Sequence, residues 1–153
     1  MAKDLEARFP EDTCVNFTYS PILRALASLQ AGDSAAAIDL LQVSTPYELA
    51  IPGSWFGFFG NLYPAYVRGL SFLAARQGVE AVTEFEKILR DSALVWSDPV
   101  GPAARLQLAR ALVLSGKPSE AKSAYQNFLV LWKDADGGIP ILKQAKAEYA
   151  RLQ

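Results

Sequence analysis

The side chains that carry out most acid–base and nucleophilic chemistry are scarce in this sequence. Its 153 residues contain no histidine and a single cysteine, Cys14, which we interpret as a small apolar residue. Without histidine there can be no Ser-His or Cys-His nucleophile pair, and the commonest metal ligand is missing as well. The sequence also has no glycine-rich phosphate loop with a following lysine. We therefore expect a protein that is not an enzyme and that holds neither a cofactor nor a metal ion.

Two pairs of acidic residues are close enough in the sequence to be considered as catalytic or metal-binding carboxylates. Glu84 and Glu86 fall in an expected helix, where residues two apart do not share a face, so a catalytic dyad is not expected. Asp134 and Asp136 fall in an expected turn and can contact Ca²⁺. The other oxygen ligands of a calcium-binding loop are missing, so we expect no site there.

The side chains best suited to recognising another molecule are tyrosines and one arginine. Tyrosine offers a large rigid surface with one polar group, and an arginine can pair with a carboxylate of a bound peptide. The candidate residues share one expected position, the inner face of the first helix in each of three helical hairpins: Tyr19, Ile22, Leu26, Tyr63, Tyr66, Leu70, Leu106, Arg110 and Val113. The alternative is that these side chains pack against a neighbouring hairpin or an aromatic link.

An aromatic cluster lies between the first and second expected hairpins. It consists of Trp55, Phe56, Phe58 and Phe59, with Gly57 between them. Such a cluster can be an exposed patch that contacts a partner, or it can be buried between the hairpins. Trp96 and Trp132, near the ends of second helices, are expected to pack between hairpins.

The hairpins themselves are indicated by a register of small residues. Each first helix carries a small residue, each second helix carries an alanine 12 residues later, and a large apolar residue follows four positions beyond that. Residues four apart share a helix face, and two helices approach closely only where small side chains meet. The three sets are Ala25, Ala37 and Leu41; Gly69, Ala81 and Phe85; and Ala109, Ala121 and Tyr125.

This register predicts an all-α fold of the tetratricopeptide (TPR) kind, with about three hairpins stacked into a solenoid. The alanines of the second helices are 44 and 40 residues apart, longer than the ~34 of a bare TPR, so HEAT and armadillo repeats remain the alternative. Gly32-Asp33 and Gly116-Lys117-Pro118 are typical of helix ends and starts. Arg76-Gln77-Gly78 is a weaker turn.

The expected boundaries treat the whole chain, 1–153, as one domain. The hairpins occupy 19–44, 63–92 and 99–133, and the aromatic link occupies 45–62. Residues 1–10 read as the last turns of a helix from a preceding repeat. Residues 139–153 read as a capping helix with an apolar stripe that shields the last hairpin.

Several segments resemble a known family. They are FPEDT at 9–13, LYPAYVRG at 62–69, EFEKIL at 84–89, SDPVGPAARLQLARA at 97–111, AYQNFLVLWKDAD at 124–136 and IPILKQAKAEYARL at 139–152. They are similar to the C-terminal TPR region of bacterial eukaryotic-like serine/threonine protein kinases. The resemblance implies a docking or sensory module of a larger kinase. The kinase motifs themselves, HRD, DFG and the glycine-rich loop, do not match this sequence.

Charge and hydropathy narrow the expected partners. The formal net charge is −1 and no run of lysines and arginines is present, so neither nucleic acid nor an anionic membrane is expected as a partner. The most apolar stretch, 49–63, is too short and too interrupted to span a bilayer. We therefore expect a scaffold that binds a peptide or a protein. The alternatives are a spacer, a homodimerisation module, or a small-molecule sensor that uses the aromatic link; the compartment stays open.

One TPR subclass grips the C-terminal carboxylate of a chaperone tail with lysines, arginines and asparagines. The matching positions here hold Ile22, Leu26, Val67 and Gln107. The resemblance to that subclass fails, so we expect no binding of EEVD-type peptides.

Overall fold

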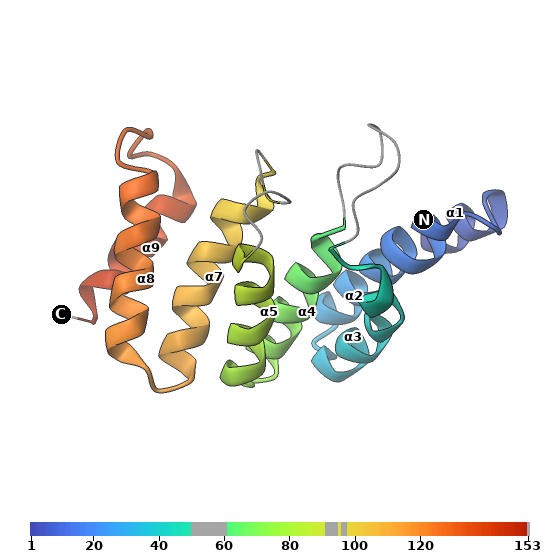
Figure 1. Cartoon of the computed structure of the whole chain (residues 1–153), viewed down its shortest axis with the longest axis horizontal. Coiled ribbons are helices and arrows are strands. Elements are labelled where there is room, and N and C mark those ends of the chain that lie inside the picture. The colour runs from blue at the N-terminus through green and yellow to red at the C-terminus, as the bar shows by residue number, and fades with distance from the viewer. Residues whose placement is uncertain (50–60, 91–94, 96–97, 153) are drawn as a thin grey trace.

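The computed structural model describes residues 1–49, 61–90, 95 and 98–152, and within these ranges the chain forms helices and no strand. The expected all-α class is therefore confirmed. The helices follow one another in chain order along the long axis of the molecule, and the two termini lie at opposite ends (Figure 1).

Three helical hairpins make up most of the described chain. Each has a first and a second helix, joined by a short turn. They are α2 (Ser20–Gln30) with α3 (Ser34–Leu40), α4 (Tyr63–Ala74) with α5 (Gly78–Arg90), and α7 (Val100–Leu114) with α8 (Pro118–Leu131). We call these pairs the first, second and third hairpin.

Two further helices flank the hairpins. Helix α1 (Ala2–Arg8) precedes them and none of its seven residues, all of them described, is buried. It is held to α2 by Glu6, which accepts a hydrogen bond from Ser20 and pairs with Arg24 at 2.5 Å. Helix α9 (Pro140–Ala150) follows the third hairpin, close to the expected 139–153.

The hairpins stack on one another in sequence. Helix α4 contacts both α2 and α3, and α7 contacts both α4 and α5, so each new first helix packs on the whole of the preceding hairpin. Helix α9 packs mainly on α8. Residues from α9, namely Leu142 and Ala145, close an apolar core together with Leu106, Tyr125 and Phe128.

The predicted small residues lie where the helices approach one another. Ala25, Ala37, Ala81, Ala109 and Ala121 have no solvent exposure at all. Gly69 is also buried, and a side chain there would collide with the ring of Phe85. The large residues of the register, Leu41, Phe85 and Tyr125, are buried beside them, as the spacing predicted.

The turns of the first and third hairpins form as expected. Gly32 and Gly116 adopt left-handed backbone conformations, with φ of 82° and 73°, which glycine enters without a steric penalty. Asp33 then caps α3, because its carboxylate accepts a hydrogen bond of 2.9 Å from the Ala36 amide. Pro118 begins α8.

Two boundaries differ from the expected ones. The first hairpin was expected to run over 19–44, but α3 ends at Leu40 and a 3₁₀ helix, Gln42–Tyr47, follows it. This helix contains Pro46, which cannot donate the backbone hydrogen bond that an α-helix needs. Ahead of α2 the chain forms a π-helical turn, Val15–Tyr19.

Of the aromatic residues considered for packing between hairpins, the structure describes Trp132. Trp132, directly after α8, lies against Phe128 of that same helix, with ring centroids 5.6 Å apart, and is half-buried against the core that α9 closes. Trp55, Phe56, Phe58, Phe59 and Trp96 lie outside the described residues.

Candidate functional site

An open cleft of about 500 Å³ lies between the second and third hairpins. We call it the α4–α7 cleft. Its lining comes from three helices and one turn: Leu73 of α4, Arg76 just after α4, Arg110, Val113 and Leu114 of α7, and Tyr125 of α8. The walls are mostly apolar, and two guanidinium groups and a phenol supply the polar atoms.

The cleft brings together two of the nine predicted groove residues, Arg110 and Val113. Val113 is 43 % exposed, so its side chain is available to a ligand. Val113 can line the cleft because α4 and α7 are in contact and their last turns lie along the same edge of the stack, the lower edge in Figure 1.

Arg110 is already paired within the chain. Its Nε and Nη2 donate hydrogen bonds of 2.9 Å to the two carboxylate oxygens of Glu148 in α9, and Tyr125 donates a third, of 2.8 Å, to Oε2. Burial by itself would raise the pKa of Glu148, but the hydrogen bonds from Arg110 and Tyr125 outweigh it and lower the pKa below its ordinary value. Arg110 was predicted to receive a partner's carboxylate, and Glu148 occupies it instead.

The pKa of Tyr125 reflects the same hydrogen bond to Glu148. Burial raises the pKa of its phenol, and the hydrogen bond to Glu148 raises it further. The phenol therefore stays protonated and acts as a donor. This cluster of Arg110, Tyr125 and Glu148 fixes α9 to the third hairpin.

Both tyrosines of α4 have partners within the chain. Tyr63 donates a hydrogen bond of 3.2 Å to the Asp98 carboxylate, which also accepts one of 2.9 Å from the Val100 amide at the start of α7. Burial raises the pKa of Tyr63, and the Asp98 carboxylate raises it further. Tyr66 packs edge-on against Phe85 at 5.9 Å. Neither tyrosine lines the α4–α7 cleft.

The other predicted groove residues divide between core and surface. The prediction that Leu106 lines the groove is wrong, because its side chain is wholly buried under α9. Ile22 and Leu70 are half-buried and pack on the apolar cores. Tyr19, just ahead of α2, and Leu26 of α2 are exposed but lie outside the cleft.

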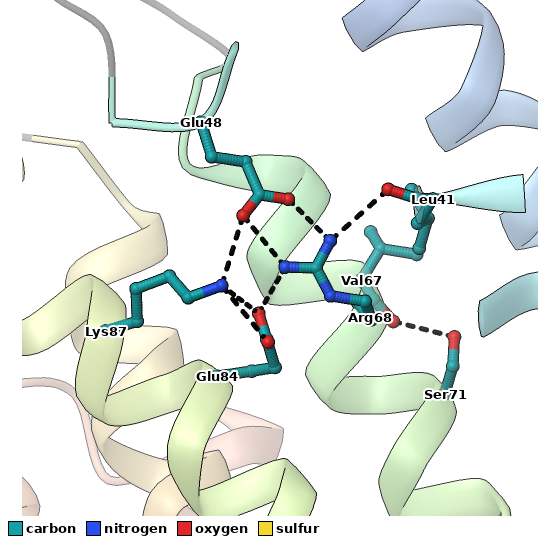
Figure 2. Close-up of polar contacts among 7 residues, drawn as sticks. All are labelled: Leu41, Glu48, Val67, Arg68, Ser71, Glu84 and Lys87. Carbon is teal, nitrogen blue, oxygen red and sulfur yellow. Dashed lines mark hydrogen bonds and ion pairs between the residues drawn. The ribbon is translucent and has the colours of Figure 1, made fainter. Parts of the chain in front are cut away.

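A second group of charged residues, which the sequence reading missed, lies between the first and second hairpins (Figure 2). We call Glu48, Arg68, Glu84 and Lys87 the charge quartet. Arg68 donates to both oxygens of Glu48 at 2.5 and 2.8 Å, and to Glu84 at 2.6 Å. Lys87 lies 3.2 Å from Glu48 and 3.0 Å from Glu84.

Three side chains of the charge quartet are nearly buried, Lys87 is partly exposed, and the four charges balance. The side chains of Arg68 and Glu48 are 4 % and 3 % exposed, and two cations face two anions. Burial alone would lower the pKa of Arg68, but the hydrogen bonds and charges of Glu48 and Glu84 raise it above its ordinary value. Arg68 also donates to the Leu41 carbonyl at 3.3 Å. The quartet therefore joins the end of the first hairpin to the second.

One signal in the sequence identifies Arg68. It is the only charged residue in the helix YPAYVRGLSFLA, and a lone charge beside the small crossing residue Gly69 must find a buried partner. Glu48 could not be identified in this way, because it lies in an irregular segment. Glu84 is buried and Glu86 exposed, so the pair occupies different faces as expected.

Across the part of the chain that the structure covers, no group of three or more Cys, Asp or Glu side chains is placed to hold a metal ion. Among the same residues, every helix is too short or too polar to cross a lipid bilayer. Comparison of the sequence with protein-family models and with curated proteins found no match.

Proposed function

We propose that this chain is a protein-binding scaffold of the TPR type, which holds a segment of a partner against the face made by α2, α4 and α7. The observation that carries the proposal is the α4–α7 cleft. Its volume of about 500 Å³ lies in the range of ligand sites, which are mostly apolar with a few polar groups. Leu73, Val113 and Leu114 offer the apolar surface.

The stacking of the hairpins supports the same proposal. Helical-repeat proteins form extended surfaces from the helices that each repeat contributes in turn, and α2, α4 and α7 are the equivalent first helices here. The resemblance of the sequence to the C-terminal region of bacterial serine/threonine kinases extends the proposal. On that basis the scaffold is the docking part of a larger signalling protein.

A selection of random peptides displayed on phage tests the proposal. The immobilised chain is expected to enrich a consensus peptide, and Val113→Asp is expected to abolish the enrichment because it places a charge on the apolar wall. Val130→Asp is the matched control, since Val130 is 67 % exposed on α8 and does not line the cleft. Failure to enrich any peptide, or equal enrichment by both variants, would refute the proposal.

A structural spacer is the second candidate function, and the charge quartet favours it. A largely buried, balanced set of four charges joins the first two hairpins, and such a set helps to fix their relative orientation. A spacer binds no peptide at the cleft, so the same selection distinguishes the two candidates.

A further inference from the structure

Arg76 adopts a backbone conformation that is unfavourable for its residue type. Its φ is 62°, in the left-handed region that glycine enters freely and other residues enter at a cost. The residue ends α4 with the hydrogen-bond pattern of a Schellman motif, from the Arg76 amide to the Leu73 carbonyl at 3.1 Å and from the Gln77 amide to the Phe72 carbonyl at 2.8 Å.

The other two hairpins place glycine at the same position. Gly32 and Gly116 end α2 and α7 with the same pair of hydrogen bonds. They stand 44 residues before and 40 residues after Arg76, which is the spacing of the hairpins themselves. The second hairpin therefore departs from the most favourable residue at one position, and that position lies at the α4–α7 cleft. Strained residues of this kind cluster at functional sites.

Arg76 is also the cation of the cleft that forms no ion pair with any described residue. Arg110 is neutralised by Glu148. Within the described parts of the chain, no carboxylate lies within ion-pair distance of Arg76. Its exposed guanidinium stands beside the apolar side chains of Leu73 and Val113. The cleft thus combines one uncompensated positive charge with an apolar wall.

We propose that Arg76 determines the specificity of the cleft, and that the occupant is a peptide segment in which an acidic residue adjoins an apolar one. The carboxylate pairs with the guanidinium of Arg76 in a charge-assisted hydrogen bond. The apolar side chain rests on Leu73, Val113 and Leu114. The inference rests on the proposed function and adds the chemistry of the partner to it.

Glu148 does not oppose this occupant. Both of its oxygens are engaged by Arg110, and one of them also by Tyr125. Its negative charge is therefore balanced before a ligand arrives. An acidic peptide is attracted to Arg76, and a basic peptide is repelled by it.

The test measures the binding of two fluorescent peptides to the full chain by anisotropy. One carries Asp next to Leu, and the other has Lys in place of that Asp. The acidic peptide is expected to bind at least about fivefold more tightly than the basic one. Arg76→Asn is expected to remove this preference, because asparagine tolerates the left-handed conformation but lacks the charge. Arg105→Asn is the control, since Arg105 is exposed on α7 and does not line the cleft.

Stability separates a binding role from a structural one. Arg76→Gly is expected to raise the melting temperature by about 2–4 °C because glycine relieves the backbone cost, while it loses the preference for the acidic peptide. The inference is overturned if Arg76→Asn binds both peptides as the unaltered chain does, or if the basic peptide binds equally well. It is overturned also if free glutamate competes as strongly as the peptide, because the ligand is then a small carboxylate. In each of these cases the phage selection can still succeed, so the proposed function is judged separately.

Discussion

Replacing Gly69 by alanine tests the close approach of α4 and α5 directly. An added methyl group would lie 2.6 Å from Cε1 and 2.7 Å from Cζ of Phe85. Carbon atoms that pack well are about 3.5–4.0 Å apart, so the methyl group, the ring or the helix must move. Phe85 is wholly buried and Tyr66 packs against its ring at 5.9 Å, so the ring cannot swing towards solvent.

Two opposing effects set the magnitude of the Gly69→Ala change. Alanine within a helix is favoured over glycine by about 1 kcal/mol. Overpacking a tight core costs about 1–3 kcal/mol, and we expect the upper half of this range because the ring is confined on both sides. The net result is a loss of about 1–2 kcal/mol in the free energy of unfolding. For a chain of this size that corresponds to a fall of about 2–8 °C in the melting temperature.

Urea denaturation followed by circular dichroism measures the effect, and a second substitution isolates its cause. The first hairpin already has an alanine and a leucine, Ala25 and Leu41, at the positions of Gly69 and Phe85. We therefore expect Gly69→Ala to be tolerated once Phe85→Leu has made room for the methyl group.

Phe85→Leu alone should cost less than the ~3–5 kcal/mol of a Phe-to-Ala change. The double variant should be more stable than the sum of the single effects by about 1–2 kcal/mol. If Gly69→Ala stabilises the protein, or if the two effects simply add, the close contact between Gly69 and Phe85 is wrong.

Three further predictions follow from the charged residues. Arg68→Met should lower the free energy of unfolding by about 3–5 kcal/mol, measured in urea, because it leaves Glu48 and Glu84 buried with only one cation between them. The free energy of unfolding should fall as the pH drops below the ordinary carboxyl pKa near 4.5. The lowered pKa of Glu148 shows that its charged form stabilises the fold, and protonation removes this contribution. The urea midpoint of Glu148→Gln should therefore change less than that of the unaltered chain between about pH 7 and about pH 4. Asp33→Ala should cost about 0.5–2 kcal/mol through loss of the cap of α3, and Asp33→Asn should restore most of it.

The helical pairing could be read from the sequence because it depends on residue size at fixed spacing. Ala25, Gly69 and Ala109 mark where helices approach, and each determines where its partner alanine must lie 12 residues later. These relations are local, within one hairpin. The helix ends at Gly32 and Gly116 are local as well, so the turn chemistry predicted them.

The candidate site was harder to predict because it depends on residues that are far apart in the chain. Arg110 was expected to face a ligand. It pairs instead with Glu148, 38 residues later, because α9 packs against the third hairpin. Leu106 is buried for the same reason. The spacing from Gly32 and Gly116 indicates that Arg76 ends the first helix of its hairpin. Its position in a cleft becomes visible only when the second and third hairpins are stacked.

Across the described residues, the helices that share most contacts are neighbours in the chain, so each hairpin is held mainly by the hairpins next to it. Pulled from its two termini, such an array is expected to lengthen in separate steps instead of unfolding all at once. The first and second hairpins, joined by the charge quartet, should release together. Helix α1, which buries none of its residues, should detach before any of them.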